Sequence, residues 1–142
     1  MTERFSIVCT VDYPRQLLRV TATGPIDSKA YVDQCIAFYC GIEDVWAFDR
    51  LYDQTQCSGF VAFEDLGRLV QVMAPIWGQA RKQPRVALAN PRRLASARFE
   101  LVTQLVQKPN HQLFNTVEEA EAWLAEPHDR DRRLADPARG VL

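Results

Sequence analysis

The chain has 142 residues, a length that fits one domain with a hydrophobic core of its own. Its 17 basic and 18 acidic side chains nearly cancel, so the charge balance does not favour a nucleic-acid partner. No apolar run approaches the roughly 20 residues of a membrane-spanning helix, and no signal sequence opens the chain. We therefore expect a cytoplasmic protein without a membrane span.

The cysteines and histidines show no metal-ligand spacing. None of Cys9, Cys35, Cys40 and Cys57 belongs to a Cys-x-x-Cys pair, and three of the four fall in segments with core composition. We interpret them as reduced thiols that pack as small hydrophobic side chains. No metal site and no cofactor is expected.

Two β-branched runs, at residues 5–11 and 16–23, are separated by a turn that contains Pro14. They predict an antiparallel hairpin at the start of the chain. Gly24 and Pro25 break the second strand, and Asp27 then occupies the position of a helix N-cap.

The middle of the chain predicts a strand, a polar loop and a helix. Residues 46–52 have strand composition, residues 53–59 are polar, and apolar residues from Phe63 to Met73 recur at helical intervals. Pro75 should end or kink this helix, so that the residues after it form a separate turn.

Residues 85–89 are apolar at four successive positions, as in a central strand that is covered on both faces. Asn90 and Pro91 then have the pattern of a helix cap and a first helical residue. Leu94 and Leu101 are predicted to extend the core face of that helix.

A short strand at residues 111–114 precedes a last helix, in which Thr116 and Glu119 have capping-box spacing. The order of elements predicts an α/β fold with a mixed sheet of about five strands, an N-terminal antiparallel hairpin and about four helices. We expect one domain at residues 1–126 and a charged, flexible tail at residues 127–142.

The chain resembles the STAS or SpoIIAA-like superfamily, in particular its bacterial STAS/SEC14-type members, over residues 5–125. The resemblance rests on the order of the elements and on three stretches, at residues 18–26, 85–88 and 113–124. The resemblance implies a small non-catalytic domain. Such a domain is either a protein-binding switch controlled by phosphorylation or a binder of lipid-like or nucleotide-like ligands.

Antagonists of the SpoIIAA kind are phosphorylated on a serine within an Asp-Ser-Ser-Gly motif. The stretch that resembles it here has Ser58 and Gly59 in place, whereas Gln56 replaces the aspartate and Cys57 replaces the first serine. The resemblance implies Ser58 as the candidate phosphoacceptor.

The polar loop at residues 53–59 is the first candidate site. Asp53, Thr55, Cys57 and Gly59 follow a strand, and open α/β sheets place ligand sites at the carboxyl ends of their strands. Turn chemistry and hydroxyl capping are the alternative explanation of the same residues.

Arg92 and Arg93 form the second candidate site, together with the nearby Arg81, Lys82 and Arg85. Arginines beside a helix N-terminus can hold a phosphate or a carboxylate. A solvated charged face is the alternative.

Met73, Ile76 and Trp77 form the third candidate site, because they surround the break at Pro75. An irregular segment at this place can admit an apolar ligand or a partner chain, and a buried core stripe is the alternative.

Our main hypothesis is a non-catalytic regulatory module that binds a protein partner through the 53–59 loop and the helix from Phe63. The partner is another protein or a second copy that pairs along the edge of the first hairpin. The alternative is a carrier or sensor of a small apolar, lipid-like ligand under the helix at residues 63–77.

Overall fold

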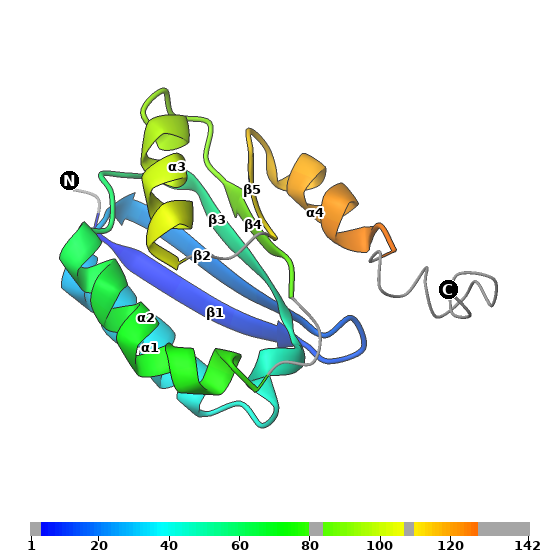
Figure 1. Ribbon diagram of the computed structural model, residues 1–142. Helices are drawn as coiled ribbons and strands as arrows, with labels where there is room; N and C mark the ends of the chain where they lie inside the picture. Colours follow the sequence, from blue (N-terminus) through cyan, green and yellow to red (C-terminus); the bar gives the residue numbers. More distant parts are fainter. Residues whose placement is uncertain (1–3, 80–83, 107–109, 128–142) are drawn as a thin grey trace.

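The computed structural model describes residues 4–79, 84–106 and 110–127, so all of the predicted tail at 127–142 except its first residue lies outside the described residues (Figure 1). The strands are β1 (Ser6–Asp12), β2 (Leu17–Pro25), β3 (Asp49–Ser58), β4 (Val86–Ala89) and β5 (His111–Phe114). The helices are α1 (Ser28–Cys40), α2 (Phe63–Trp77), α3 (Ala95–Val106) and α4 (Val117–Ala125), with a single 3₁₀ turn, η1, at Val45–Ala47.

The strands form one five-stranded sheet in the order β1-β2-β3-β4-β5. β1 pairs antiparallel with β2, and all later neighbours are parallel. Each parallel step is connected through a helix, as parallel neighbours require. The predicted mixed sheet with an N-terminal hairpin is therefore confirmed.

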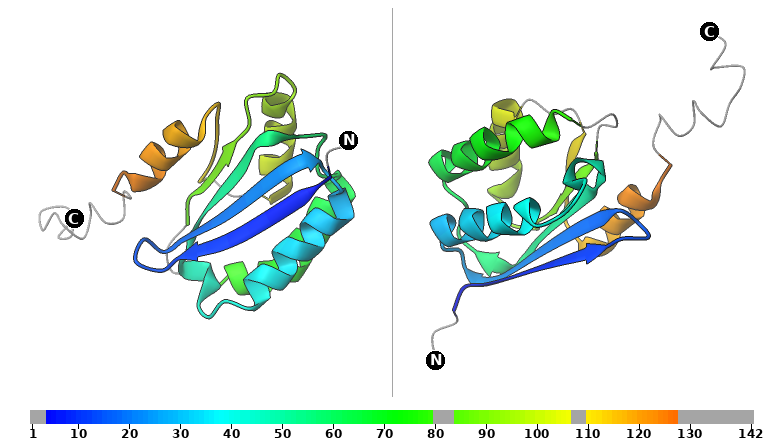
Figure 2. Two further views of the ribbon diagram at one scale, coloured as in Figure 1. Left: turned by 180° about the vertical axis from the view of Figure 1, so that it is seen from behind. Right: turned by 90° about the horizontal axis from the view of Figure 1, so that it is seen from below.

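Helices cover both faces of the sheet (Figures 1 and 2). α1, α2 and α3 lie on one face, and α4 lies on the other. Alternate residues of a strand point to opposite faces of the sheet, and β2 contributes core residues on both faces. Leu18 and Val20 join the core under α1 and α2, whereas Leu17 packs with Leu51 and Ala120 in the core under α4.

Two helix starts follow the sequence pattern. The Asp27 carboxylate accepts from the backbone N–H of Ala30 at 3.1 Å and caps α1. The Thr116 hydroxyl accepts from the N–H of Glu119 at 3.1 Å and caps α4. Both predicted caps are confirmed.

β3 begins later than predicted. Trp46 lies in η1, which follows Asp44 at a φ of 56°, and β3 starts only at Asp49. The predicted strand start at residue 46 is therefore wrong. Trp46 and Val45 instead pack against the core under α1 and α2 as part of the turn.

β3 also ends later than predicted. The expected loop at residues 53–59 is strand as far as Ser58, which pairs with Pro25 of β2. The register shifts between Thr21 and Thr23, where β3 carries one more residue than β2. This bulge accommodates the polar residues within the strand, so the loop prediction is wrong.

α2 continues through Pro75 to Trp77, so the predicted separate turn after the proline is wrong. Proline removes only one helical hydrogen bond, the one to the carbonyl of Gln71. Pro75 and Gln71 are both exposed, and water can satisfy that carbonyl.

α3 begins at Ala95 and not at Pro91, so the predicted cap at Asn90 is wrong. The Asn90 side chain is held elsewhere: its Nδ2 donates to Gln54 Oε1 at 3.1 Å, and its Oδ1 accepts from the N–H of Arg92 at 3.0 Å. The amide therefore closes a short turn at the end of β4.

Leu94 and Leu101 are 65% and 53% exposed, so their predicted place in the core is wrong. The inner face of α3 is instead formed by Ala95, Phe99 and Val102, which line a cavity.

Candidate functional site

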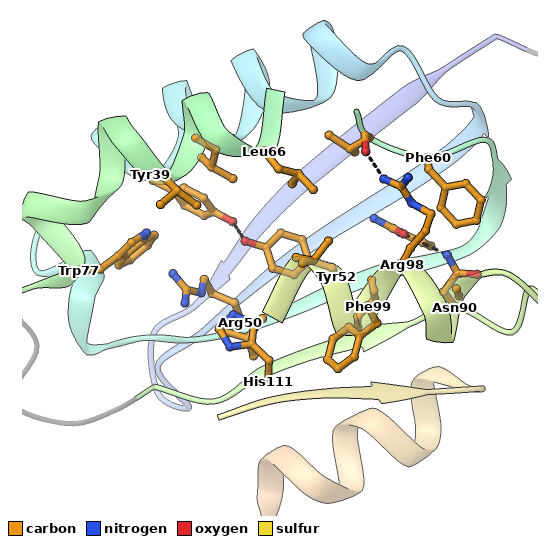
Figure 3. Close-up of a pocket in the computed structure, with 18 of the residues that line it drawn as sticks. Tyr39, Arg50, Tyr52, Phe60, Leu66, Trp77, Asn90, Arg98, Phe99 and His111 are labelled. Atoms are coloured by element: carbon orange, nitrogen blue, oxygen red, sulfur yellow. Dashed lines mark hydrogen bonds between the residues drawn. The ribbon is translucent and has the colours of Figure 1, made fainter. Parts of the chain in front are cut away.

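A cavity of about 320 Å³ lies between α2, α3 and the sheet (Figure 3). Its apolar wall comes from the facing sides of the two helices. This wall includes Leu66, Leu69, Val70, Phe99 and Val102. Cavities of this size, apolar with a few polar groups, are typical of small-molecule sites.

The sheet supplies the polar groups of the cavity. Arg50, Tyr52 and Gln54 alternate along β3, so all three point to the same face of the sheet, under α2 and α3. Register places Arg50 beside Val86 of β4, and Val86 beside His111 of β5. One row across three strands thus forms one end of the cavity floor.

Tyr52 shares a hydrogen bond with Tyr39 of α1, and their hydroxyls point toward one another in Figure 3. Burial raises the pKa of Tyr52 to about 12, although the nearby Arg50 lowers it. Burial also raises the pKa of Tyr39 well above its usual range. Both tyrosines are therefore neutral at physiological pH.

Arg50 is 7% exposed and lines the cavity beside this tyrosine pair. Its guanidinium carbon lies 4.0 Å from the centre of the Trp77 ring, a cation–π contact at the end of α2. Its Nε is buried without a hydrogen-bond partner among the described residues. A buried cation with one aromatic contact is a costly arrangement.

A chain of side-chain hydrogen bonds crosses the floor beyond Tyr52. Asn90 donates to Gln54 at 3.1 Å, and Gln54 Nε2 donates to the Tyr31 hydroxyl at 3.0 Å. Each amide has its orientation fixed by these neighbours, so this part of the floor is rigid.

The opposite end of the cavity is closed by Arg98 of α3. Its guanidinium carbon lies 4.6 Å from the Phe60 ring centre and 4.5 Å from that of Phe63, and its Nη2 donates to the carbonyl of Val61. Burial, with a smaller contribution from Arg92, lowers the pKa of Arg98. Unlike Arg50, this guanidinium is held by a carbonyl and two rings.

Three chains of solved structures match the fold of this chain. One is an uncharacterized protein of the DUF3478 family with a SpoIIAA-like fold from Shewanella loihica PV-4, with 15% identity, a TM-score of 0.57, and coverage of 88% of this chain and 98% of that one. The chain has the SpoIIAA-like fold. Another match is an anti-sigma factor antagonist from Mycobacterium paratuberculosis, with 14% identity, a TM-score of 0.55, and coverage of 89% and 100%.

No protein family and no curated protein matches the sequence. The predicted resemblance to the SpoIIAA-like superfamily is confirmed at the level of the fold, which similarity at this identity establishes. A shared fold does not by itself specify a function, so function is argued from the site.

The polar residues of the 53–59 stretch lie mostly outside the cavity of this SpoIIAA-like domain. Asp53 Oδ1 accepts from the N–H and the hydroxyl of Thr55, at 3.0 and 2.7 Å, which stabilises the bulge of β3. Cys57 is buried, and burial raises the pKa of its thiol, with Arg92 acting in the opposite direction. A raised pKa disfavours the thiolate that nucleophilic chemistry requires.

Ser58 and Gly59 lie at the end of β3. The Ser58 residue is exposed while its carbonyl accepts from the N–H of Ile26 at 2.8 Å. Gly59 adopts a φ of 76°, a conformation that favours glycine. The sharp turn at Gly59 therefore presents Ser58 at the surface.

The three apolar candidates are only partly brought together. Trp77 lines the cavity, whereas Met73 is fully buried in the core under α1 and α2, and Ile76 packs against that core. A cavity therefore lies under the 63–77 helix, but residues other than these three candidates form most of its lining.

The basic candidates do not form one cluster. Arg92 stacks on Phe60 at 4.2 Å and Arg93 is exposed, and both precede the first turn of α3. Arg85 donates to the carbonyls of Trp123 and Glu126 at the end of α4, each at 2.7 Å. Arg81 and Lys82 lie outside the described residues.

The described residues contain no group of three or more histidines, cysteines or acids that is arranged to hold a metal ion. Within the same ranges, no helix is both long enough and apolar enough to cross a membrane.

Proposed function

We propose that this SpoIIAA-like domain binds a small, mostly apolar molecule in the cavity between α2, α3 and the sheet, as a carrier or sensor. The observation that carries the proposal is the cavity itself, about 320 Å³ in volume and walled by aliphatic and aromatic side chains. Burying apolar surface is favourable, so an apolar ligand that covers this wall would gain the free energy that the wall does not gain in contact with water.

The packing of the two helices supports a ligand at this place. Leu66, Leu69 and Val70 of α2 and Phe99 and Val102 of α3 are all only partly buried, although they face the interior. α2 and α3 are therefore separated where two helices of a closed core would interdigitate. An apolar ligand would complete this part of the core.

Filling the cavity tests the proposal. We expect Val102→Trp to weaken the binding of decanol and naphthylmethanol by about tenfold or more, because the indole occupies the space that the probe would use. Leu101→Trp is the matched control, since Leu101 is the neighbouring residue of α3 and is 53% exposed. It should bind both probes as the wild type does.

Isothermal titration calorimetry on the wild type and the two variants gives the comparison. If neither the alcohols nor the carboxylates with the same carbon skeletons bind the wild type, the cavity is not an apolar-ligand site and the proposal is wrong. If both tryptophan variants bind equally well, the probes bind outside the cavity.

A regulatory protein-binding module is the second candidate function, and the exposure of Ser58 favours it. Ser58 lies beside a tight turn that leads toward α2, where a phosphate would be accessible to a partner protein. The fold that the chain shares with an anti-sigma factor antagonist is compatible with this candidate.

Phosphopeptide mapping of the protein isolated from its own cells tests this second candidate. We expect phosphate on Ser58, and we expect Ser58→Asp to change the set of proteins that co-purify while leaving the melting temperature close to that of the wild type. Ser58→Ala is the control for loss of the hydroxyl alone. An unmodified Ser58, with the same proteins captured by all three forms, would count against the candidate.

A further inference from the structure

Arg50 is the one fully charged side chain on the cavity floor, and its charge is not balanced by the described residues around it. It is 7% exposed, and its Nε has no hydrogen-bond partner there. No aspartate or glutamate is among the described residues that line the cavity. Buried charges are normally paired, so a site that keeps one unpaired is prepared for a counter-charge from outside.

Neighbouring groups do not supply that counter-charge. Asp49 precedes Arg50 in β3 and so points to the other face of the sheet, where its carboxylate accepts from the N–H of Arg85 at 2.9 Å. Tyr39 and Tyr52 are close, but burial raises the pKa of each phenol, so neither is an anion at physiological pH. Trp77 offers only the face of its ring.

The shape of the cavity separates this cation from an apolar space. Arg50 lies at the end next to Trp77 and His111, while Leu66 and Phe60 line the cavity toward its other end (Figure 3). A molecule that fills the site thus meets the unpaired positive charge at one end and the mostly apolar wall of the two helices beyond it, as far as Arg98, whose guanidinium is held by a carbonyl and two rings. Such a site is complementary to an amphipathic anion.

We propose that the ligand of this cavity is a small amphipathic carboxylate, with its carboxylate on Arg50 and its apolar body between α2 and α3. This inference rests on the proposed binding function and adds the chemical class of the ligand. A carboxylate suits the site because its two oxygens match the fork of guanidinium N–H groups, and its single charge matches a single arginine.

The neighbouring groups strengthen such a contact. The Trp77 ring holds one face of the guanidinium, which leaves its N–H edge for the ligand. The cavity is lined mainly by apolar groups, and a charge-assisted hydrogen bond is stronger in such surroundings than in water. Arg98 is less suitable as the anchor, because it already donates to Val61 and stacks on two phenylalanine rings.

Two pairs of probes test the inference on the wild-type protein: decanoate against decanol, and naphthoate against naphthylmethanol. Within each pair the carbon skeleton is the same, and the head group changes from a charged carboxylate to a neutral hydroxymethyl group. We expect calorimetry to show each carboxylate binding about tenfold or more tightly than its alcohol at neutral pH. This comparison requires no variant and does not depend on one folding.

Arg50→Met then locates the charge that causes the preference. We expect it to remove the preference for the carboxylate while decanol binding changes little, and Arg50→Lys to retain part of the preference. Arg98→Met is the control for the other cavity-lining arginine, and it should keep the preference.

The outcomes are distinguishable. Alcohols that bind as tightly as the carboxylates would overturn the inference and leave the apolar-ligand proposal intact. A preference that survives Arg50→Met but is lost in Arg98→Met would overturn the assignment to Arg50. Absence of binding by all four probes would overturn the inference together with the proposed function.

Discussion

Gly24→Ala should lower the free energy of unfolding by about 2 kcal/mol or more. Gly24 lies near the end of β2 at a φ of 78°, a conformation that side chains with a Cβ rarely adopt. A Cβ built there would lie 2.4 Å from the carbonyl oxygen of Arg4, so the backbone before β1 would have to move. That segment is anchored, because the Phe5 ring stacks on the ring of Tyr31, 6.2 Å away.

Gly67→Ala is the matched control, and we expect it to have the opposite sign. Gly67 lies inside α2, and a Cβ added there meets nothing within 4 Å beyond its chain neighbours and the backbone of its own helix. Alanine should therefore raise the free energy of unfolding by about 0.5 to 1 kcal/mol through its higher helix propensity. Urea denaturation of both variants measures the two changes, and a Gly24→Ala protein as stable as the wild type would contradict the reasoning.

The sequence predicted those parts of the fold whose causes are local. Asp27 and Thr116 cap helices through backbone groups three residues away, so spacing alone was enough to locate α1 and α4. The hairpin of β1 and β2 likewise depends on one turn and two alternating runs. These elements fixed the order of strands and helices, and with it the fold.

The errors occur where a distant residue decides the local structure. Asn90 has the right type for a cap, but its amide is held by Gln54 on β3, and α3 begins later. The polar residues from Asp53 onward read as a loop, yet pairing with β2 holds them in a strand that absorbs one extra residue. Spacing along the sequence does not show that Gln54 would hold the Asn90 amide, or that β2 would pair with the end of β3.

Local sequence patterns also did not predict most of the residues that line the cavity. Trp77 was recognised, but Arg50 appeared only as a charged residue inside a strand, and its importance comes from Trp77 and Tyr52 lying beside it. One signal was present in the sequence: Arg50, Tyr52 and Gln54 alternate along a strand with a covered face. A charge in such a row is a reason to look for a buried cation.

Alkaline pH should destabilise the fold strongly, because the folded chain buries thiol and phenol groups in their protonated form. Burial raises the pKa of the Cys35 thiol from 9.0 to about 12, with a smaller contribution from Cys9, and it raises the pKa of the Tyr52 phenol from 10.0 to about 12. Below about pH 9 the folded and unfolded chains both hold these protons. Between about pH 9 and about pH 12 the unfolded chain loses them first, so the free energy of unfolding falls as pH rises.

We expect these two groups to contribute a loss on the order of 4 kcal/mol by about pH 11, the larger part from Cys35, whose thiol has the lower pKa in the unfolded chain; the raised pKa of Tyr39 acts in the same direction. Urea denaturation under reducing conditions, from neutral pH upward, measures the slope. Cys35→Ala should flatten the slope even though it lowers stability at neutral pH, whereas Cys40→Ala, at an exposed position of the same helix, should follow the wild type. An equally steep fall in Cys35→Ala would mean that other protons drive the alkaline transition. Tyr52→Phe then distinguishes the phenol next to Arg50 from the thiol on the buried face of α1, and so relates the pH dependence to the floor of the cavity.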